Sequence, residues 1–154
     1  MSFDFKDHVV LVTGAGAGIG QAIAGAFHGA GARVALGDMR EAPLKRAASA
    51  LGGGIFSQVV DVRDPASVAS FAEQAEKALG RITVAVANAG IYPNTPGLDM
   101  TVEEWDRVME TNVRGVFLTC QAAAHHSSGA PSPRPVAIPA LEQNTSTGPS
   151  SASA

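Results

Sequence analysis

The sequence lacks several features that mark common protein classes. It contains a single cysteine, Cys120, so no internal disulfide can form, and no Cys/His spacing resembles a zinc site. The formal net charge is -3 and lysine and arginine form no cluster, which argues against a basic surface for nucleic acid or an anionic membrane. No apolar run approaches the roughly 20 residues of a membrane-spanning helix, and the N-terminal residues lack a signal-peptide pattern. We therefore expect a cytoplasmic protein with no nucleic-acid, membrane or metal partner.

Apolar runs alternate with helical patterns along most of the chain. The run before Gly14 is short and rich in β-branched residues, as in a strand buried on both faces. Asp64 followed by Pro65 is typical of an N-cap and a first helical residue. This alternation predicts an α/β fold, a doubly wound parallel sheet of about four strands in one domain. We expect strands over 9–13, 33–37, 55–60 and 82–87, and helices over 18–30, 41–51 and 65–79.

Unusual residues follow each predicted strand. The glycine-rich turn follows the first strand, and Asp38, Asp61 and Asn88-Ala89-Gly90 follow the other three. Parallel sheets bind ligands at the carboxyl ends of their strands, near the point where the strand order reverses. Glycine also lets a phosphate approach the main chain at a helix N-terminus. The sequence therefore predicts a dinucleotide site at this edge of the sheet.

A further helix is expected after the fourth strand. Thr101 and Glu104 have the spacing of a capping box, and apolar residues continue at helical spacing to about Ala124. Cys120 lies on the apolar face of this helix, so we expect it in the core and not as a nucleophile.

The composition changes abruptly at His125. Residues 125–154 contain no aromatic residue, no lysine and no aspartate, and are rich in serine, proline and alanine. Such a segment buries too little apolar surface to offset its conformational entropy. We therefore expect a folded domain over 1–124 and a disordered, low-complexity tail over 125–154, with His125 and His126 in the free chain.

The glycine turn has a specific spacing. It reads Thr13-Gly14-x-x-x-Gly18-Ile19-Gly20 and fits the common fingerprint G-x-G-x-x-G in no register. A turn of this kind could be only a tight strand-to-helix connection. Its spacing resembles the cofactor signature of the short-chain dehydrogenase/reductase family, and the resemblance extends over about Lys6 to Ala124. It implies the N-terminal, NAD-binding portion of a Rossmann-like fold, with an incomplete sheet and a truncated chain.

The resemblance implies roles for the residues at the strand ends. Asp38 would hold the adenosine ribose hydroxyls, which favours NAD over NADP because a carboxylate repels a 2′-phosphate; Arg40 nearby weakens this preference. Asp61 would accept a hydrogen bond from the adenine amine while Val62 packs on the ring. The full set of expected cofactor contacts is Thr13, Gly14, Gly16, Ala17, Gly18, Ile19, Gly20, Asp38, Met39, Asp61, Val62, Asn88, Ala89, Gly90 and Ile91.

Several of these residues also have a structural interpretation. Asp38 could cap the following helix, Asn88 could tie neighbouring strands together, and Ile91 could be a core contact.

Asn112 matches the helical asparagine of the family, one of four catalytic residues, which holds a water in a proton relay through its backbone and a helix distortion. Without the resemblance, an asparagine inside a helix would be a mild misfit or a solvated position.

The other catalytic residues of the family are absent from the sequence. The family transfers hydride between a nicotinamide and an alcohol or ketone with a Tyr-x-x-x-Lys pair, whose lysine lowers the pKa of the tyrosine, and a serine that orients the substrate. The only tyrosine, Tyr92, is followed four residues later by Pro96, and no lysine follows Lys77. We therefore expect this chain to be inactive, with Tyr92 a loop aromatic near the mouth of the pocket.

Two functional interpretations follow. The first is an NAD(H)-binding oxidoreductase by descent, whose partner is a small alcohol or ketone. A frameshift near His125 would explain its altered C-terminal composition, and the coding DNA would then encode the missing motif in another frame. The second is a non-catalytic nucleotide-binding or subunit-interaction module. Self-association is expected through the open edge of the strand over 82–87 or the helix around 112–124.

Overall fold

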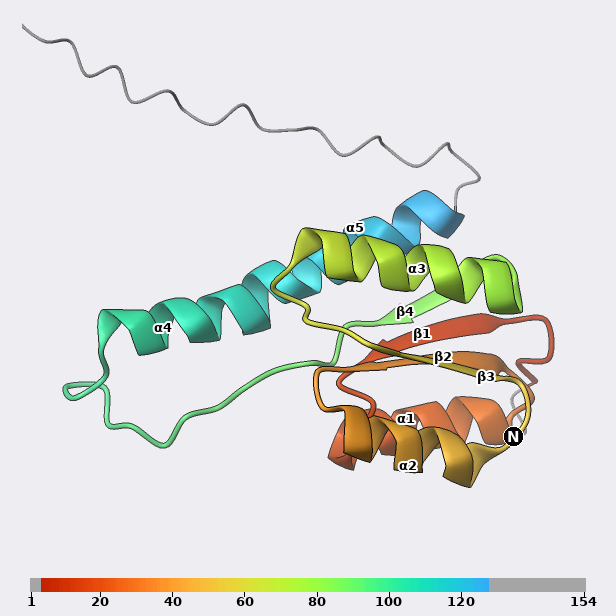
Figure 1. The fold of residues 1–154 in the computed structure, drawn as a ribbon, viewed down its shortest axis with the longest axis horizontal. Helices are drawn as coiled ribbons and strands as arrows, with labels where there is room; N and C mark the ends of the chain where they lie inside the picture. The colour runs from red at the N-terminus through yellow and green to blue at the C-terminus, as the bar shows by residue number, and fades with distance from the viewer. Residues whose placement is uncertain (1–3, 128–154) are drawn as a thin grey trace, which may run out of the picture.

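A four-stranded parallel sheet forms the centre of the computed structural model, which describes residues 4–127 (Figure 1). Its strands are β1 (Val9–Thr13), β2 (Arg33–Asp38), β3 (Ile55–Val59) and β4 (Val84–Val86), in the order β3-β2-β1-β4. Each neighbouring pair is parallel. The chain steps outward from β1 to β3 and then crosses back to place β4 on the other side of β1. The strand order thus reverses between β1 and β4, and the predicted doubly wound α/β sheet is confirmed.

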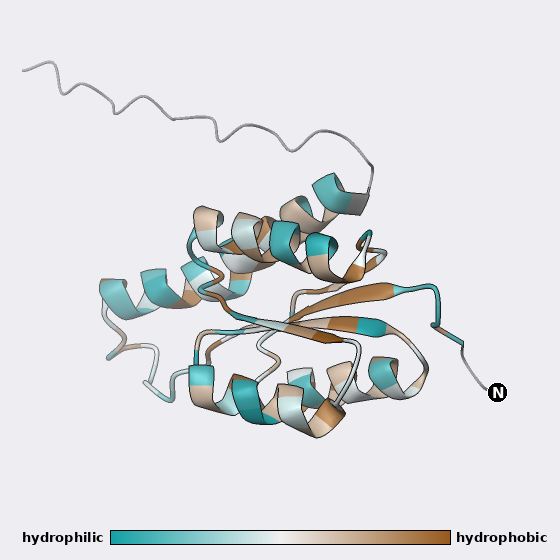
Figure 2. Cartoon of the chain, turned by 45° about the vertical axis from the view of Figure 1, so that its right-hand side comes forward, coloured by the Kyte–Doolittle hydropathy of each residue, from teal (hydrophilic) through white to brown (hydrophobic). Residues whose placement is uncertain are grey.

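Helices cover both faces of this sheet. α1 (Gly18–Gly29) and α2 (Glu41–Leu51) pack on one face, and α3 (Pro65–Leu79) and α5 (Gly115–Ser127) pack on the other (Figure 1). The strands are mainly hydrophobic and lie between the two helix layers (Figure 2). Burial of each large apolar side chain contributes about 1.5–3 kcal/mol to the stability of the fold. The largest fully buried side chains include Phe71, Leu11, Leu36 and Ile82.

Two helices begin at the capping residues that the sequence predicts. The side chain of Asp64 accepts a hydrogen bond from the amide of Ala66 at 2.9 Å, with Pro65 at the first helical position of α3. Thr101 Oγ1 accepts from the amide of Glu104 at 3.2 Å at the start of α4 (Val102–Met109). Both side chains satisfy amide groups that have no partner inside the helix.

The fourth strand is shorter than the predicted range of 82–87. Before it, the amide of Thr83 donates to the Val9 carbonyl at 2.9 Å, but the amide of Val9 donates to Thr83 Oγ1 at 3.1 Å, so a side chain replaces one of the two backbone contacts. After it, the amide of Asn88 donates to the carbonyl of Val86 at 3.0 Å and turns the chain away. Among the described residues, β4 pairs only with β1, and its outer edge has no neighbouring strand.

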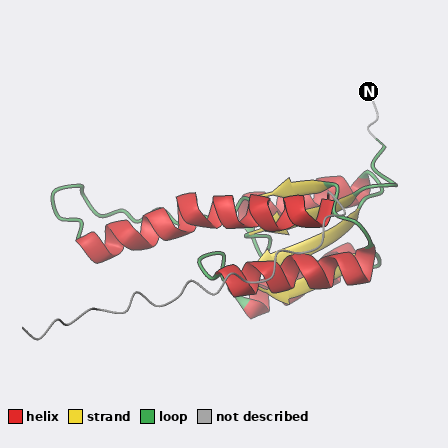
Figure 3. Cartoon of the chain, turned by 90° about the horizontal axis from the view of Figure 1, so that it is seen from above, coloured by secondary structure: helices red, strands yellow, loops and turns green. Residues whose placement is uncertain are grey.

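One long helical rod follows β4. α4 continues through a π-helical segment, η1 (Glu110–Arg114), into α5, and the rod extends past the edge of the sheet (Figures 1 and 3). It packs on α3 and on the segment before it, where a side chain at Gly115 would lie only 2.8 Å from Val62 Cγ2. Leu118, Ala122 and Ala123 of the rod pack against the core, but most of its other large apolar side chains are exposed. Five of these exposed side chains, here called the apolar stripe, are Trp105, Met109, Val113, Val116 and Phe117.

The position of Cys120 corrects the sequence-based expectation. Its side chain is exposed and is not part of the core. The buried positions nearby are Thr119 and Ala123, at 1% and 4% exposure. Thr119 can be buried because its Oγ1 donates to the carbonyl of Gly115 at 2.8 Å, which satisfies the hydroxyl inside its own helix. Apolar periodicity alone therefore selected the wrong face of α5.

The end of the rod gives a second correction. His125 and His126 belong to α5 and not to a free chain. His126 Nδ1 lies 2.5 Å from Glu76 Oε2 on α3, so this ring ties the end of the rod to the neighbouring helix. The remainder of the predicted tail, residues 128–154, lies outside the described residues. Over residues 4–127, no helix has the length and apolar character needed to cross a membrane.

Candidate functional site

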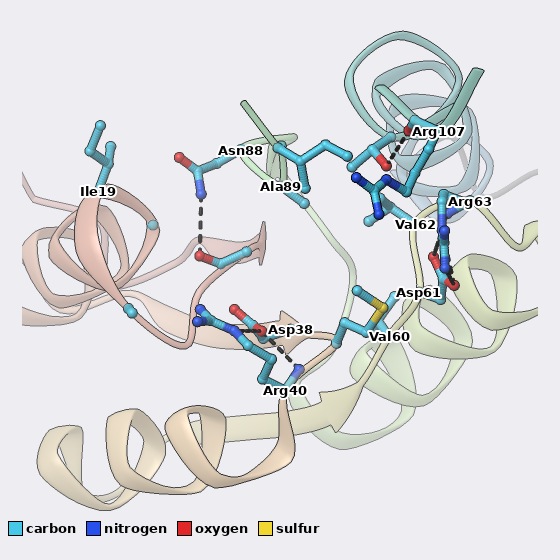
Figure 4. A pocket seen from close by; sticks show the side chains of 17 residues that line it. Ile19, Asp38, Arg40, Val60, Asp61, Val62, Arg63, Asn88, Ala89 and Arg107 are labelled. Carbon is cyan, nitrogen blue, oxygen red and sulfur yellow. Dashed lines mark hydrogen bonds and ion pairs between the residues drawn. The ribbon is translucent and has the colours of Figure 1, made fainter. Parts of the chain in front are cut away.

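A cleft of about 650 Å³ lies at the carboxyl ends of the strands (Figure 4). It opens beside the point where the strand order reverses, where ligands bind in folds of this kind. Twelve of the predicted cofactor contacts line it: Gly14, Ala17, Ile19, Gly20, Asp38, Met39, Asp61, Val62, Asn88, Ala89, Gly90 and Ile91. The structure therefore brings the four predicted strand ends together around one cavity.

The glycine turn presents the start of α1 to this cleft. Gly18 has a φ of +58°, and a side chain there would meet no atom within 4 Å, so the turn is open to a ligand. A side chain at Gly20 would collide with the carbonyl of Gly14, which lets α1 start close to β1. No side chain caps the first amides of α1. These amides and the helix dipole form a site suited to a phosphate.

Two predicted contacts hold the glycine turn in place on the side away from the cleft. Thr13 is 1% exposed, and its Oγ1 donates to the carbonyl of Val86 at 3.5 Å and accepts from the amide of Ala89 at 3.3 Å. The amide of Gly16 donates to Asp38 Oδ2 at 2.9 Å. Neither residue lines the cleft, and neither does Gly18. Thr13 and Gly16 hold the glycine turn against β4 and β2.

Asp38 lies at the end of β2 with its carboxylate facing the turn. Its side chain is 7% exposed, and besides Gly16 it accepts from the amide of Arg40 at 2.9 Å and from Arg40 Nε at 3.4 Å (Figure 4). The N-cap of α2 is Arg40, with no side-chain cap hydrogen bond. Asp38 therefore does not cap α2, and its carboxylate is a fixed acceptor inside the cleft.

Asp61 follows β3 and pairs with Arg63. Arg63 Nη2 lies 2.7 Å from Asp61 Oδ2, and each side chain is 33% exposed. Hydrogen bonds from the Arg63 side chain lower the pKa of Asp61, although partial burial acts in the opposite direction. Next to it, Val62 is 7% exposed and packs against Gly115 of α5. The carboxylate and the apolar side chain thus lie side by side at one end of the cleft (Figure 4).

The two asparagines make backbone contacts. Asn88 Nδ2 donates to the carbonyls of Thr13 and Gly14 at 3.0 and 3.3 Å, so it joins the end of β4 to the glycine turn. Asn112 lies in the π-helical segment; its Oδ1 accepts from the amide of Ile91 and its Nδ2 donates to the Ile91 carbonyl, both at 2.8 Å. It does not line the cleft but fixes the backbone of a residue that does.

Five lining residues were outside the predicted contact set. Arg40 and Arg63 each follow an aspartate by two residues, and this repeated Asp-x-Arg spacing is a signal that could have identified them. Val60 lies in the chain next to Asp61, whereas Arg107 and Thr111 have no comparable sequence signal, because a fold contact brings them to the cleft. Tyr92 does not line it and is 90% exposed. Within residues 4–127, no three His, Cys, Asp or Glu side chains gather to hold a metal ion.

Comparisons with known proteins agree with this architecture. The family model described as short chain dehydrogenase matches residues 8–134. The D-threitol dehydrogenase of Mycolicibacterium smegmatis is 38% identical over 127 residues, which cover 79% of this chain and 49% of that protein. A short-chain type dehydrogenase/reductase structure from Mycobacterium marinum is 41% identical, with a TM-score of 0.77, covering 81% of this chain and 52% of that one.

A third relative was solved with a cofactor. The 3-ketoacyl-(acyl-carrier-protein) reductase from Brucella melitensis, in complex with NADH, is 33% identical with a TM-score of 0.76, covering 79% of this chain and 50% of that one. The chain thus spans about half the length of these relatives. With a family match over most of its length and a Rossmann-like sheet that gathers the expected strand ends, the chain belongs to the short-chain dehydrogenase family.

Proposed function

We propose that the cleft binds NAD(H). The observation that carries this proposal is the fixed Asp38 carboxylate, which lies beside the uncapped amides at the start of α1. A diphosphate needs the amides and dipole of a helix N-terminus, and a ribose diol needs an acceptor nearby. Both requirements are met within one cavity, whose other end carries Asp61 and Val62 for the base.

Each group of residues in the cleft would hold a different part of the dinucleotide. The glycine turn and α1 would hold the diphosphate, Asp38 the adenosine ribose, and Asp61 with Val62 the adenine. Ile91, held by Asn112, would border the nicotinamide. When bound, NAD supplies a hydride acceptor, and NADH a hydride donor, for a carbonyl or alcohol.

We further propose a preference for NAD over NADP. Asp38 is almost completely buried and held by two backbone amides, so it cannot turn away from a 2′-phosphate. Arg40 opposes this preference weakly, because its side chain is 63% exposed and its Nε lies 3.4 Å from Asp38. Two charges of the same sign in a partly buried site repel more strongly than a solvated arginine can offset.

Fluorescence titration with NADH and NADPH tests both statements. We expect saturable NADH binding that is at least about tenfold tighter than NADPH binding, and a loss of NADH affinity in Asp38→Ala. Asp99→Asn, an exposed position outside the cleft, is the matched control and should bind like the original chain. Equal affinity for both cofactors would show that Asp38 does not select between them.

We propose that this chain alone does not catalyse hydride transfer. A phenol must be brought toward neutral pKa before it exchanges protons efficiently, and no lysine stands at the family spacing from Tyr92. The chain would then act as a nucleotide-binding module. Purified chain should oxidise no NADH in the presence of small ketones or aldehydes. Turnover that disappears on substitution of Asn112 would contradict this statement.

The apolar stripe supports self-association through the rod. Phe117 and Val113 are 60% and 55% exposed, and both lie on the same outward face. Burial of these side chains in a second copy would remove apolar surface from water. Sedimentation velocity should detect a dimer that Phe117→Glu weakens and that Ser49→Glu, at an exposed position of α2, leaves unchanged. A monomer at all concentrations would rule out this contact.

A further inference from the structure

The carboxylate of Asp61 is held by one neighbour, Arg63. Oδ1 accepts from the amide of Arg63 at 3.0 Å and from its Nε at 2.9 Å. Oδ2 accepts from Nη2 at 2.7 Å and, at the longer distance of 3.2 Å, from Nε. A guanidinium that binds both carboxylate oxygens fixes the plane of the carboxylate as well as its position. Asp61 therefore presents a single orientation to the cleft that it lines.

This arrangement leaves Asp61 with limited hydrogen-bonding capacity. A carboxylate offers about four lone-pair positions. Three N–H groups of Arg63 occupy three of them, because the amide and Nε bond Oδ1 and Nη2 bonds Oδ2. The longer contact of Nε with Oδ2 shares the single N–H that Nε already directs at Oδ1 and takes no further position. One acceptor position on Oδ2 remains for a ligand, and the side chain is exposed enough to reach it. The Arg63 hydrogen bonds also keep the pKa of Asp61 low, so the group stays ionised and cannot donate.

The backbone around Asp61 has separate support. The amide of Asp61 donates to Ser67 Oγ at 3.1 Å, and the amide of Asp64 donates to the Asp61 carbonyl at 3.2 Å. The amide of Arg63 makes its hydrogen bond with any side chain at that position except proline. Replacing the Arg63 side chain should therefore release the carboxylate without unfolding the turn.

We infer that Arg63 is a positioning residue for base recognition, because it leaves Asp61 one acceptor toward the cleft and so selects a base with an exocyclic amine. The inference rests on the proposed function, binding of a dinucleotide in this cleft. Adenine carries an amine, whereas the isosteric hypoxanthine carries an oxo group at the same position. An oxo group would place two acceptors against each other and leave both without a hydrogen bond.

The test compares two dinucleotides that differ only at this position. Calorimetric titration of the full chain would use NADH and reduced nicotinamide hypoxanthine dinucleotide. We expect the original chain to bind NADH about tenfold more tightly. The preference should fall to about twofold or less in Arg63→Gln, and to an intermediate value in Arg63→Lys, which keeps the charge but not the planar fork. Lys45→Gln removes an ion pair with Glu41 outside the cleft and should keep the full preference.

Each outcome separates the two proposals. Tight and equal binding of both dinucleotides by the original chain would overturn base selection and leave dinucleotide binding intact. An undiminished preference in Arg63→Gln and Arg63→Lys would overturn the role of Arg63. Binding of neither dinucleotide would overturn the proposed function and this inference with it. Thermal unfolding identifies a destabilised variant, and if Arg63→Gln is unfolded, the preference of Arg63→Lys decides the matter.

Discussion

Two strand ends of this chain carry the same spacing, an aspartate followed two residues later by an arginine, but the two pairs have different structures. Asp38 is 7% exposed, and the amides of Gly16 and Arg40 hold its carboxylate at 2.9 Å. The Arg40 side chain reaches it only at 3.4 Å. Asp61 is one-third exposed, and the Arg63 side chain donates hydrogen bonds to both of its carboxylate oxygens. The fold fixes the first aspartate, and a single side chain fixes the second.

The position of each strand explains the difference. β2 is a central strand between β1 and β3, so the turn after β1 lies over its carboxyl end and supplies the Gly16 amide to Asp38. β3 is an edge strand with a neighbour on one side only, so no backbone amide from an adjoining strand end reaches Asp61 in the described residues. An arginine within the same turn takes that place. Equal sequence spacing therefore produces an acceptor held by backbone amides in the middle of the sheet and one held by a side chain at its edge.

The largest effect is expected for Asp38→Ala. The substitution leaves the amide of Gly16 in a buried position without its partner, which should lower the free energy of unfolding by about 1–3 kcal/mol. NADH affinity should fall at least about tenfold because the ribose acceptor is lost. Urea unfolding and NADH titration measure the two effects. A loss of stability below about 0.5 kcal/mol would mean that the Gly16 contact is not what fixes this carboxylate.

Asp61→Ala should have a smaller effect. The pair it breaks is partly exposed, and ion pairs of this kind contribute about 1 kcal/mol or less to stability. NADH affinity should fall about three- to tenfold through loss of one base contact. The same two measurements apply, with Asp99→Asn as the control. If Asp61→Ala destabilised the chain more than Asp38→Ala, the contrast between the two strand ends would be reversed.

The smallest effect is a pH dependence at Asp61. Hydrogen bonds from the Arg63 side chain lower the pKa of Asp61 from its ordinary value of 3.8. A lowered pKa in the folded chain adds stability above that ordinary value, and the contribution disappears as the pH falls through the folded pKa. The stability difference between the original chain and Arg63→Gln should therefore be present near neutral pH and shrink below pH 3.8. Unfolding curves at several pH values would show this, and a difference that grows in acid would contradict it.

Local sequence signals predicted much of the fold. Asp64 and Thr101 cap helices because their side chains bond amides only two or three residues away. The glycine turn was predicted from its spacing, which the structure accounts for through the open position at Gly18 and the close approach at Gly20. Alternation of apolar runs and helical patterns gave the strand count and the parallel sheet, since periodicity reflects which side chains are buried.

Long-range packing explains what the sequence did not predict. The apolar face that contains Cys120 is exposed, because α5 packs through the small residue Gly115 and through Thr119, whose hydroxyl is satisfied within the helix. Arg107 reaches the cleft only because α4 and the π-helical segment pass over it. The contact between His126 and Glu76 joins two residues that are 50 positions apart in the sequence. No local pattern encodes such contacts.

An amide-resolved NMR titration of the chain with NADH tests most directly whether the cleft binds the cofactor. If the cleft binds the cofactor, the amide signals that shift should come from the glycine turn, Asp38 to Arg40, Asp61 to Arg63 and Asn88 to Ile91. Signals from the exposed face of α2, which does not line the cleft, should stay unchanged. Absence of saturable shifts, or shifts confined to residues outside these four strand ends, would contradict cofactor binding in this cleft.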